Sequence, residues 1–240
     1  KRGYCADVST FSVVIPTLQR ATTLPMLLER LERSPAVAEV IVINNAARPL
    51  AVTGNKIMVL DQTENLFVNP AWNLGVADAT APYLALCNDD IVFPTAVFDR
   101  IALLLRRRVG IVGPDTSCFQ TAPDRCHPRF RRVLRRPFGY GTLMCLRRDA
   151  YTQIPDSLKI WYGDDYLFWS QPHRNFSFSG VGIQTQMGTT ASAPEFSARL
   201  RQDQANFASA MVDQTHRRRR LEWTALQAAS SLKRRLRPTN

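Results

Sequence analysis

The stretch "ALCNDDIVF" at residues 85–93 is an apolar run that is interrupted by Asn88, Asp89 and Asp90 and then resumes. Carboxylates resist burial unless an opposite charge neutralises them. The stretch therefore predicts a buried strand whose end either turns into solvent or presents two carboxylates to a divalent cation. The elements on either side of it help to decide between these two interpretations.

Strand and helix patterns alternate along the chain around this stretch. Apolar runs predict strands at residues 11–17, 39–45, 55–62, 82–90, 109–115 and within 138–151. Helices are predicted at residues 22–34, 70–79 and 95–108, the first with Thr22 or Thr23 as N-cap and Pro25 in its first turn. Continuous apolar strands that alternate with helices are typical of a mostly parallel sheet covered on both faces. We therefore predict an α/β fold.

Polar side chains end three of these strands. In parallel α/β sheets, ligands bind beyond the carboxyl ends of the strands, so such side chains converge on one rim. The polar groups are Thr17 with Gln19 and Arg20, Asn44 with Asn45, and Asn88 with Asp89 and Asp90. This convergence favours a divalent cation, Mg²⁺ or Mn²⁺, held by hard oxygen ligands and in turn binding a diphosphate.

A second acidic pair, Asp164 and Asp165, follows Gly163 at the expected start of a helix. Aromatic residues surround the pair in sequence: Trp161, Tyr162, Tyr166, Phe168 and Trp169. Carboxylates in an aromatic-walled pocket can have a raised pKa and act as a general base toward a hydroxyl. The alternative is a helix N-cap, which the exposed amides and the helix dipole favour, and the two roles are compatible.

The net charge of +11 is concentrated in two segments. Residues 125–148 hold eight arginines and no acid, interleaved with aromatic residues. We interpret them as an arginine-rich loop beside a site that handles diphosphates or anionic acceptors. Nucleic acid is the minor alternative, because no zinc-finger spacing, RNP motif or basic region with heptads accompanies the arginines.

The second basic segment is the tail, residues 216–237. Its apolar residues fall at roughly helical spacing: Leu221, Ala225, Ala228, Leu232 and Leu236. A basic amphipathic helix of this kind binds anionic membrane surfaces. A solvated charge run or a contact with another domain explains the pattern equally well.

The five cysteines indicate reduced thiols in a cytosolic protein rather than a disulfide framework, because their number is odd and two lie in apolar runs. Zinc is not expected, because Cys118, Cys126, His127 and Cys145 lack the paired spacing of zinc ligands. No apolar run is long enough to span a bilayer, and residues 1–10 lack the apolar core of a signal peptide. We expect a cytoplasmic location, peripheral to the inner face of a membrane if the tail binds lipid.

Five segments, in this order and spacing, resemble the GT-A-fold glycosyltransferases of family 2. They are "VVIPTLQR" (13–20), "VIVINNAA" (40–47), "NLFVNPAWNLGVADATAPYLALCNDDI" (65–91), "GTLMCLRRDAY" (141–151) and "WYGDDYLFW" (161–169). The resemblance implies a GT-A (Rossmann-like) fold with a mostly parallel central sheet flanked by helices. The implied organisation is an N-terminal extension (1–10), a nucleotide-sugar-binding half (11–115), an acceptor-binding and catalytic half (116–192) and a basic helical tail (193–240).

The resemblance also implies inverting transfer of a sugar from a nucleotide-sugar donor, UDP- or dTDP-linked, to a hydroxyl of a glycan or lipid-linked glycan. Asp165 would be the general base, with Asp164 beside it, and Asp90 and Asp89 would bind Mn²⁺ or Mg²⁺. The donor-binding residues would be Pro16, Thr17, Arg20, Asn44, Asn45, Asn73, Asn88 and Asp89. The acceptor-binding residues would be Gly141, Trp161, Tyr162 and Trp169.

The chain departs from the family pattern at four places. Asn44 and Asn88 stand where Asp is common, Phe67 where Gly is common, and residues 184–186 where a His often completes the metal site. A non-catalytic GT-A-like module that binds a nucleotide sugar or glycan within a larger assembly is therefore the alternative hypothesis. A nucleotidyltransferase is less well supported, because the loop after the first strand, "TLQRATT", contains no glycine.

Overall fold

A computed structural model describes residues 10–186 and 197–214. The major strands are β1 (Phe11–Thr17), β2 (Val37–Asn44), β3 (Ile57–Asp61), β4 (Tyr83–Cys87), β6 (Val112–Pro114), β7 (Cys126–Arg132), β8 (Leu143–Arg147) and β9 (Phe176–Val181), and two short strands are β5 (Ile91–Val92) and β10 (Gln184–Thr185). The α-helices are α1 (Leu24–Glu32), α2 (Val68–Asp78), α3 (Val97–Leu105), α4 (Gly163–Ser170) and α5 (Ser197–Gln214). Three short 3₁₀ turns cover Thr116–Gln120, Tyr140–Thr142 and Arg148–Ala150. The predicted basic tail, residues 216–237, lies outside the described residues.

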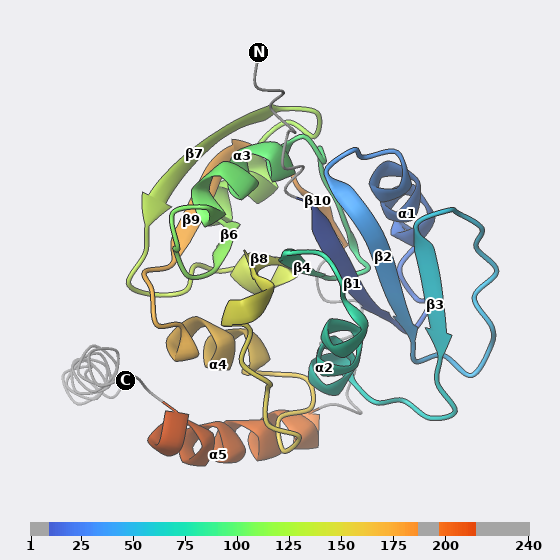
Figure 1. Ribbon diagram of the computed structural model, residues 1–240. Helices are drawn as coiled ribbons and strands as arrows, with labels where there is room; N and C mark the ends of the chain where they lie inside the picture. The colour runs from blue at the N-terminus through green and yellow to red at the C-terminus, as the bar shows by residue number, and fades with distance from the viewer. Residues whose placement is uncertain (1–9, 187–196, 215–240) are drawn as a thin grey trace, which may run out of the picture.

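The sheet has eight strands in the order β3-β2-β1-β4-β8-β6-β9-β7 (Figure 1). Strands β3, β2, β1 and β4 are mutually parallel, and β6 is parallel to β9, whereas β8 and β7 run antiparallel to their neighbours. Strands β5 and β10 form a separate two-stranded pair. The prediction of an α/β fold with a mostly parallel sheet is confirmed, with the four consecutive parallel strands in the N-terminal half.

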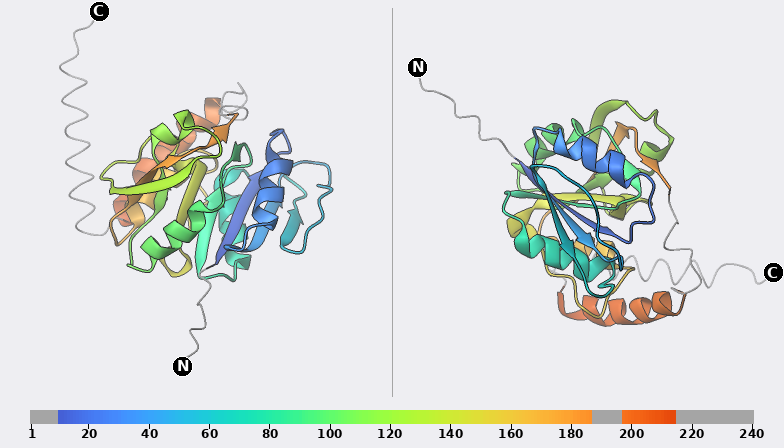
Figure 2. Two further views of the ribbon diagram at one scale, coloured as in Figure 1. Left: turned by 90° about the horizontal axis from the view of Figure 1, so that it is seen from above. Right: turned by 90° about the vertical axis from the view of Figure 1, so that its right-hand side faces the viewer.

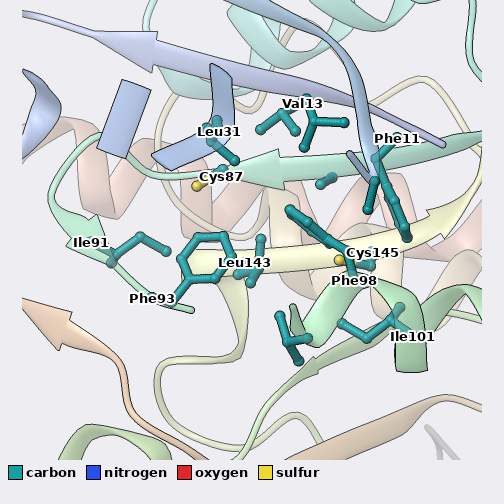
Figure 3. Close-up of a cluster of buried hydrophobic side chains, with 14 of the residues drawn as sticks. Phe11, Val13, Leu31, Cys87, Ile91, Phe93, Phe98, Ile101, Leu143 and Cys145 are labelled. Atoms are coloured by element: carbon teal, nitrogen blue, oxygen red, sulfur yellow. The ribbon is translucent and has the colours of Figure 1, made fainter. Parts of the chain in front are cut away.

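Helices cover both faces of this sheet. Figures 1 and 2 show α1 and α3 on one face and α2, α4 and α5 on the other. The amphipathic pattern of α1 explains its place, because its four leucines all point into the first core: Leu24, Leu27, Leu28 and Leu31. Figure 3 shows that core, in which Phe11 and Phe98 stack at 4.6 Å between ring centroids. The second core contains Trp72, Phe168 and Phe207 from the opposite helices.

Helix α2 lies unusually close to strand β1, and Gly75 makes this approach feasible. A Cβ at that position would lie 2.3 Å from a methyl carbon of Val14. The helix therefore packs its backbone directly on the strand, which carries the N-terminus of α2 to the carboxyl end of β1. Ligands of α/β sheets bind at that end.

The prediction of a loop for the arginine-rich segment is wrong over residues 126–132, which form the edge strand β7. Half-buried and exposed side chains alternate there, with Cys126, Pro128 and Phe130 turned inward and arginines outward. This period of two is the pattern of a strand with one solvated face. Positive charge on an edge strand also disfavours pairing with another chain.

The described residues contain no helix that is both long and apolar enough to cross a lipid bilayer.

Candidate active site

A cleft of about 740 Å³ opens at the carboxyl ends of β1, β2 and β4. Its walls come from these strand ends, from the N-terminal parts of α2 and α4, and from α5. The lining residues are Pro16, Thr17, Leu18, Asn45, Asn65, Phe67, Val68, Trp72, Asn88, Asp89, Asp90, Arg136, Phe138, Thr142, Ile160, Trp161, Tyr162, Asp164, Asp165 and Leu200. The cleft thus brings both acidic pairs to one cavity although they lie far apart in the sequence.

The strand ends are joined directly by hydrogen bonds. The hydroxyl of Thr17 donates to Oδ2 of Asp89 at 2.6 Å, and the backbone N–H of Asn45 donates to the carbonyl of Thr17 at 2.8 Å. The backbone N–H of Asn88 donates to the carbonyl of Thr142 at 2.9 Å. The predicted convergence of polar strand ends on one rim is therefore present for Thr17, Asn45 and the Asn-Asp-Asp triplet.

Both carboxylates of the first acidic pair are largely buried. Burial raises the pKa of Asp89 to about 6, although the hydrogen bond from Thr17 acts in the opposite direction. Burial likewise raises the pKa of Asp90, whose residue is 8% exposed. Its Oδ1 atom is buried and has no hydrogen-bond partner within the described part of the chain. An unpartnered carboxylate oxygen at this depth is costly without a cation.

These oxygens fit a hard divalent cation. Mg²⁺ and Mn²⁺ sites commonly use one or two carboxylates and complete their coordination with water and substrate phosphates. No cluster of three or more His, Cys, Asp or Glu side chains suited to a metal occurs in residues 10–186 and 197–214. Residues 184–186, where family members often carry a histidine, lie beside Asp90, because the N–H of Gln186 donates to the carbonyl of Asp90 at 3.1 Å.

Asn45 and Phe67 shape the side of the cleft beside β2. Oδ1 of Asn45 accepts a hydrogen bond from the N–H of Leu66 at 3.1 Å, which ties the strand end to the loop before α2. Phe67 adopts a φ of 68°, a region that glycine tolerates and that costs other residues roughly 1–3 kcal/mol. The guanidinium of Arg199 lies over its ring, 5.3 Å from the centroid. This cation–π contact helps to hold the strained residue in place.

Arg136 contacts both carboxylates of the second acidic pair. Its Nε and Nη2 donate to Oδ1 and Oδ2 of Asp165 at 2.8 and 3.0 Å, and its Nη1 lies 2.9 Å from Oδ2 of Asp164. Burial raises the pKa of Asp164 to about 6, while Arg136 opposes this rise. Burial alone would lower the pKa of Arg136, but the two carboxylates outweigh it and hold that pKa above its usual value. The predicted placement of the pair at a helix start is confirmed, since both lie in the first turn of α4.

Close packing brings α4 next to α2 and to the segment before β8. A Cβ at Gly163 would lie 2.0 Å from Oδ1 of Asn69, and a Cβ at Gly141 would lie 2.4 Å from Oδ2 of Asp164. Only glycine fits at either position without a shift of its neighbour. The two glycines therefore set where the N-terminus of α4 enters the cleft.

The loop that carries Trp161 and Tyr162 into the cleft is fixed by Asp203 of α5. The fully buried carboxylate of Asp203 accepts hydrogen bonds from three consecutive backbone N–H groups. The donors are Lys159, Ile160 and Trp161, at 3.2, 2.9 and 3.0 Å. Tyr162 also stacks on Phe207 with ring centroids 5.0 Å apart. Helix α5 therefore supports this wall of the cleft from below (Figure 1).

Replacing Asp203 with Asn should loosen this wall. The amide keeps one acceptor oxygen but places an NH₂ group against backbone N–H donors, and hydrogen bonds to a charged group contribute about 1.5–3 kcal/mol each. We expect a loss of about 2 kcal/mol, which lowers Tm by roughly 4–8 °C for a domain of this size. Thermal denaturation checks this, with the exposed Asp156→Asn as the control. An unchanged Tm in Asp203→Asn would contradict the role of the carboxylate.

Two residues expected to contact the donor have structural roles instead. Asn44 is fully buried, and its Nδ2 donates to the carbonyl of Arg48 at 2.8 Å and to Asp61 at 2.6 Å. Asn73 donates to the carbonyl of Ile154 at 2.8 Å and accepts from the hydroxyl of Tyr151 at 2.7 Å. Neither residue lines the cleft.

Three further expected contacts are also displaced from the cleft lining. Trp169 is 4% exposed and packs edge-on against Phe168, so the expectation that it offers a face to a sugar ring is wrong. Gly141 lies behind Asp164 rather than on the cleft surface. Arg20 is exposed and is not among the lining residues.

The cleft is also lined by residues to which the sequence assigned no individual role in the site. They are Leu18, Asn65, Val68, Trp72, Arg136, Phe138, Thr142, Ile160 and Leu200. Arg136 and Phe138 belong to the arginine-rich segment interpreted as lying beside an anion-handling site. The segments that resemble family 2 contain five others, namely Leu18, Asn65, Val68, Trp72 and Thr142. Ile160 and Leu200 have no distinguishing pattern along the chain.

The strand order and the cleft at the strand ends define the GT-A architecture, an α/β fold with a mostly parallel sheet flanked by helices. The family model "Glycosyl transferase family 2" matches residues 12–157. The chain therefore belongs to glycosyl transferase family 2. The matched region includes Asp89 and Asp90 and ends before α4, which carries Asp164 and Asp165.

Two kinds of solved structure are similar to this chain. TarS residues 1–349 from S. aureus align with a TM-score of 0.56 at 14% identity over 72% of this chain, and a UDP complex of the same TarS fragment aligns with a TM-score of 0.50. GalNAc-T7, crystallised with UDP, GalNAc and Mn²⁺, aligns with a TM-score of 0.55 at 13% identity over 75% of this chain. The chain spans 59% of the TarS fragment and 44% of GalNAc-T7. A sequence search among curated proteins finds no match.

Proposed function

We propose that the protein is a glycosyltransferase that moves a sugar from a nucleoside diphosphate donor, UDP- or dTDP-linked, to a hydroxyl of a glycan or lipid-linked glycan. The observation that carries this proposal is the meeting of two acidic pairs in one cleft of about 740 Å³. Asp89 and Asp90 supply carboxylate oxygens that suit a cation, and the cation would bind the diphosphate. Asp164 and Asp165 supply carboxylates, one of which can act as a base. Family membership and the UDP bound to two structural neighbours support the assignment.

The reaction is an inverting single displacement. The acceptor hydroxyl gives its proton to Asp165 as its oxygen forms a bond with the anomeric carbon of the donor. The bond between that carbon and the diphosphate oxygen breaks, and its electron pair leaves with the diphosphate. A base of this kind contributes roughly 10²–10⁴-fold to the rate.

Asp90 and Asp89 would hold Mn²⁺ or Mg²⁺, supported by the unpartnered Oδ1 of Asp90 and by the Mn²⁺ in the GalNAc-T7 structure. When bound, the ion neutralises charge on the leaving diphosphate. Pro16, Thr17 and Asn45 line the cleft beside the same strand ends and would contact the nucleoside. The donor-binding half would thus be residues 11–115.

The acceptor would lie against Trp161 and Tyr162, whose rings line the cleft and offer apolar faces to sugar rings. Residues 116–192 would form this acceptor-binding and catalytic half of the same domain. We place the reaction at the cytoplasmic side of a membrane if the acceptor is lipid-linked.

A thermal-shift screen tests the donor site first. UDP, dTDP and other nucleoside diphosphates are each added with Mn²⁺, with Mg²⁺ and with chelator. A ligand that binds only the folded state at about 100 times its Kd stabilises by about 2.7 kcal/mol, which corresponds to a Tm rise of roughly 5–10 °C for a domain of this size. We expect this rise for a uridine or thymidine nucleotide, and only when metal is present.

The result also separates the enzyme from the non-catalytic alternative. Donor binding without turnover of any nucleotide sugar would favour a binding module. No shift with any nucleotide or metal would contradict the proposed donor site.

A further inference from the structure

We propose that Arg136 is a positioning residue that holds the carboxylates of Asp164 and Asp165 in place in the cleft and opposes protonation of Asp164, so that Asp165 is oriented to accept a proton. The proposal rests on the proposed function, because it gives Asp165 the role of base. Arg136 itself lies outside the motifs that assigned the site.

The geometry leaves Asp165 little freedom. Nε and Nη2 of Arg136 contact its two oxygens at 2.8 and 3.0 Å, a paired arrangement that fixes the plane of the carboxylate. Nη1 reaches Asp164 at 2.9 Å, so one guanidinium holds both acids. The three side chains are 20–27% exposed, and solvent screens their interaction only in part.

Arg136 also explains how two adjacent carboxylates can share this site. Two carboxylates in a partly buried site compete for one proton, and the pKa of one of them rises strongly. A proton held in this way would occupy the group that must accept one from the acceptor. The guanidinium of Arg136 opposes the binding of such a proton. One positive and two negative groups leave a net charge of −1, so a carboxylate oxygen is still able to accept the proton of the acceptor hydroxyl.

Other charged and titratable groups near the pair do not replace this effect. Tyr162 precedes α4 and Tyr166 lies within it, and burial raises the pKa of both phenols. The carboxylate of Asp203 on α5 accepts hydrogen bonds from the backbone N–H groups of residues 159–161. Tyr140 donates its hydroxyl proton to the carbonyls of Ile111 and Phe176. Among the described residues, Arg136 is the cation paired with the two acids in the structure.

A purely structural ion pair is the competing explanation. It would tie the segment before β8 to α4 and contribute to stability, without any effect on proton uptake. The two explanations differ in what happens to the carboxyl titration when the guanidinium is removed. Loss of an adjacent positive charge raises a carboxyl pKa, so Asp164 should then titrate at higher pH.

The deciding experiment is NMR titration of ¹³C-labelled Asp carboxyl groups in the wild type, Arg136→Gln and Arg136→Lys. We expect the Asp164 carboxyl to titrate about one pH unit or more higher in Arg136→Gln. Arg136→Lys should give a smaller rise, because an ammonium group keeps the charge but cannot contact both oxygens of Asp165 in a plane. The neighbouring, exposed Arg135→Gln is the matched control and should titrate as the wild type does.

An Arg136→Gln protein that titrates as the wild type does would overturn the proposal, even if its Tm is lower. If this variant does not fold, Arg136→Met is titrated in its place, and an unchanged Asp164 titration there overturns the proposal. The titration needs no substrate, so its outcome is independent of the glycosyltransferase assignment.

Discussion

Asp165→Asn should reduce sugar transfer by at least about 10²-fold while the protein continues to bind the nucleoside diphosphate. The amide is nearly isosteric but cannot take a proton from the acceptor hydroxyl. Arg136 still has Asp164 as a partner at 2.9 Å, so the local structure should persist. Turnover is measured as release of the nucleoside diphosphate, and binding by calorimetry with Mn²⁺ present.

The neighbouring Asp164→Asn is the matched comparison, because it removes the same charge one residue away. We expect this variant to retain much more activity, since its carboxylate faces Gly141 and accepts from the N–H of Asp165 at 3.0 Å. If Asp165→Asn turns over at the wild-type rate, Asp165 is not the base. If Asp164→Asn is the inactive variant instead, Asp164 rather than Asp165 is the base.

Much of the fold was predictable because its strands and helices have strong local patterns. The continuous apolar runs of β1, β2 and β4 can only be buried from both sides, and that requires helices on both faces. The leucines of α1 recur with a helical period, and all four are buried. The edge strand β7 was expected to be a loop because its sequence is rich in arginine. The alternation typical of a strand is present only in Cys126, Pro128 and Phe130, which are half-buried at every second position.

The candidate site was predictable only where the position in the sheet determines the direction of a side chain. Thr17 ends β1 and Asp89 follows β4, its parallel neighbour, so the 2.6 Å contact between their side chains follows from topology. Asn44 also ends a strand, but its side chain donates hydrogen bonds to the adjacent loop and to Asp61 on β3 instead of entering the cleft. These hydrogen bonds depend on the conformation of the loop, which cannot be predicted from the apolar pattern of the strand.

Trp169 and Arg136 illustrate two other limits. Trp169 lies four residues after Asp165, about 6 Å further along α4, and this distance takes it from the cleft into the core. Arg136 reaches the acidic pair from a distant segment, and its contact depends on the path between β7 and β8. Neither outcome follows from residue type or spacing.

Asp90→Ala should abolish the part of donor affinity that depends on metal. Partners outside the coordination sphere of a metal typically contribute 10–100-fold to its affinity, so loss of a direct ligand should weaken metal-dependent binding of UDP by at least about tenfold. Affinity measured with chelator should be the same in the variant and the wild type. Calorimetric titration of UDP with Mn²⁺ and with chelator gives both values, and the exposed Asp78→Ala is the control.

Stability provides a second, independent test of the same residue. Oδ1 of Asp90 is buried with no hydrogen-bond partner in the described residues, so without metal this oxygen is an uncompensated cost to the fold. The Tm of Asp90→Ala in chelator should therefore equal or exceed that of the wild type, while added Mn²⁺ should stabilise only the wild type. A carboxylate with a purely structural role predicts the reverse, namely a lower Tm in chelator and an equal response to Mn²⁺. Wild-type behaviour of Asp90→Ala in both calorimetry and melting would remove Asp90 from the metal site.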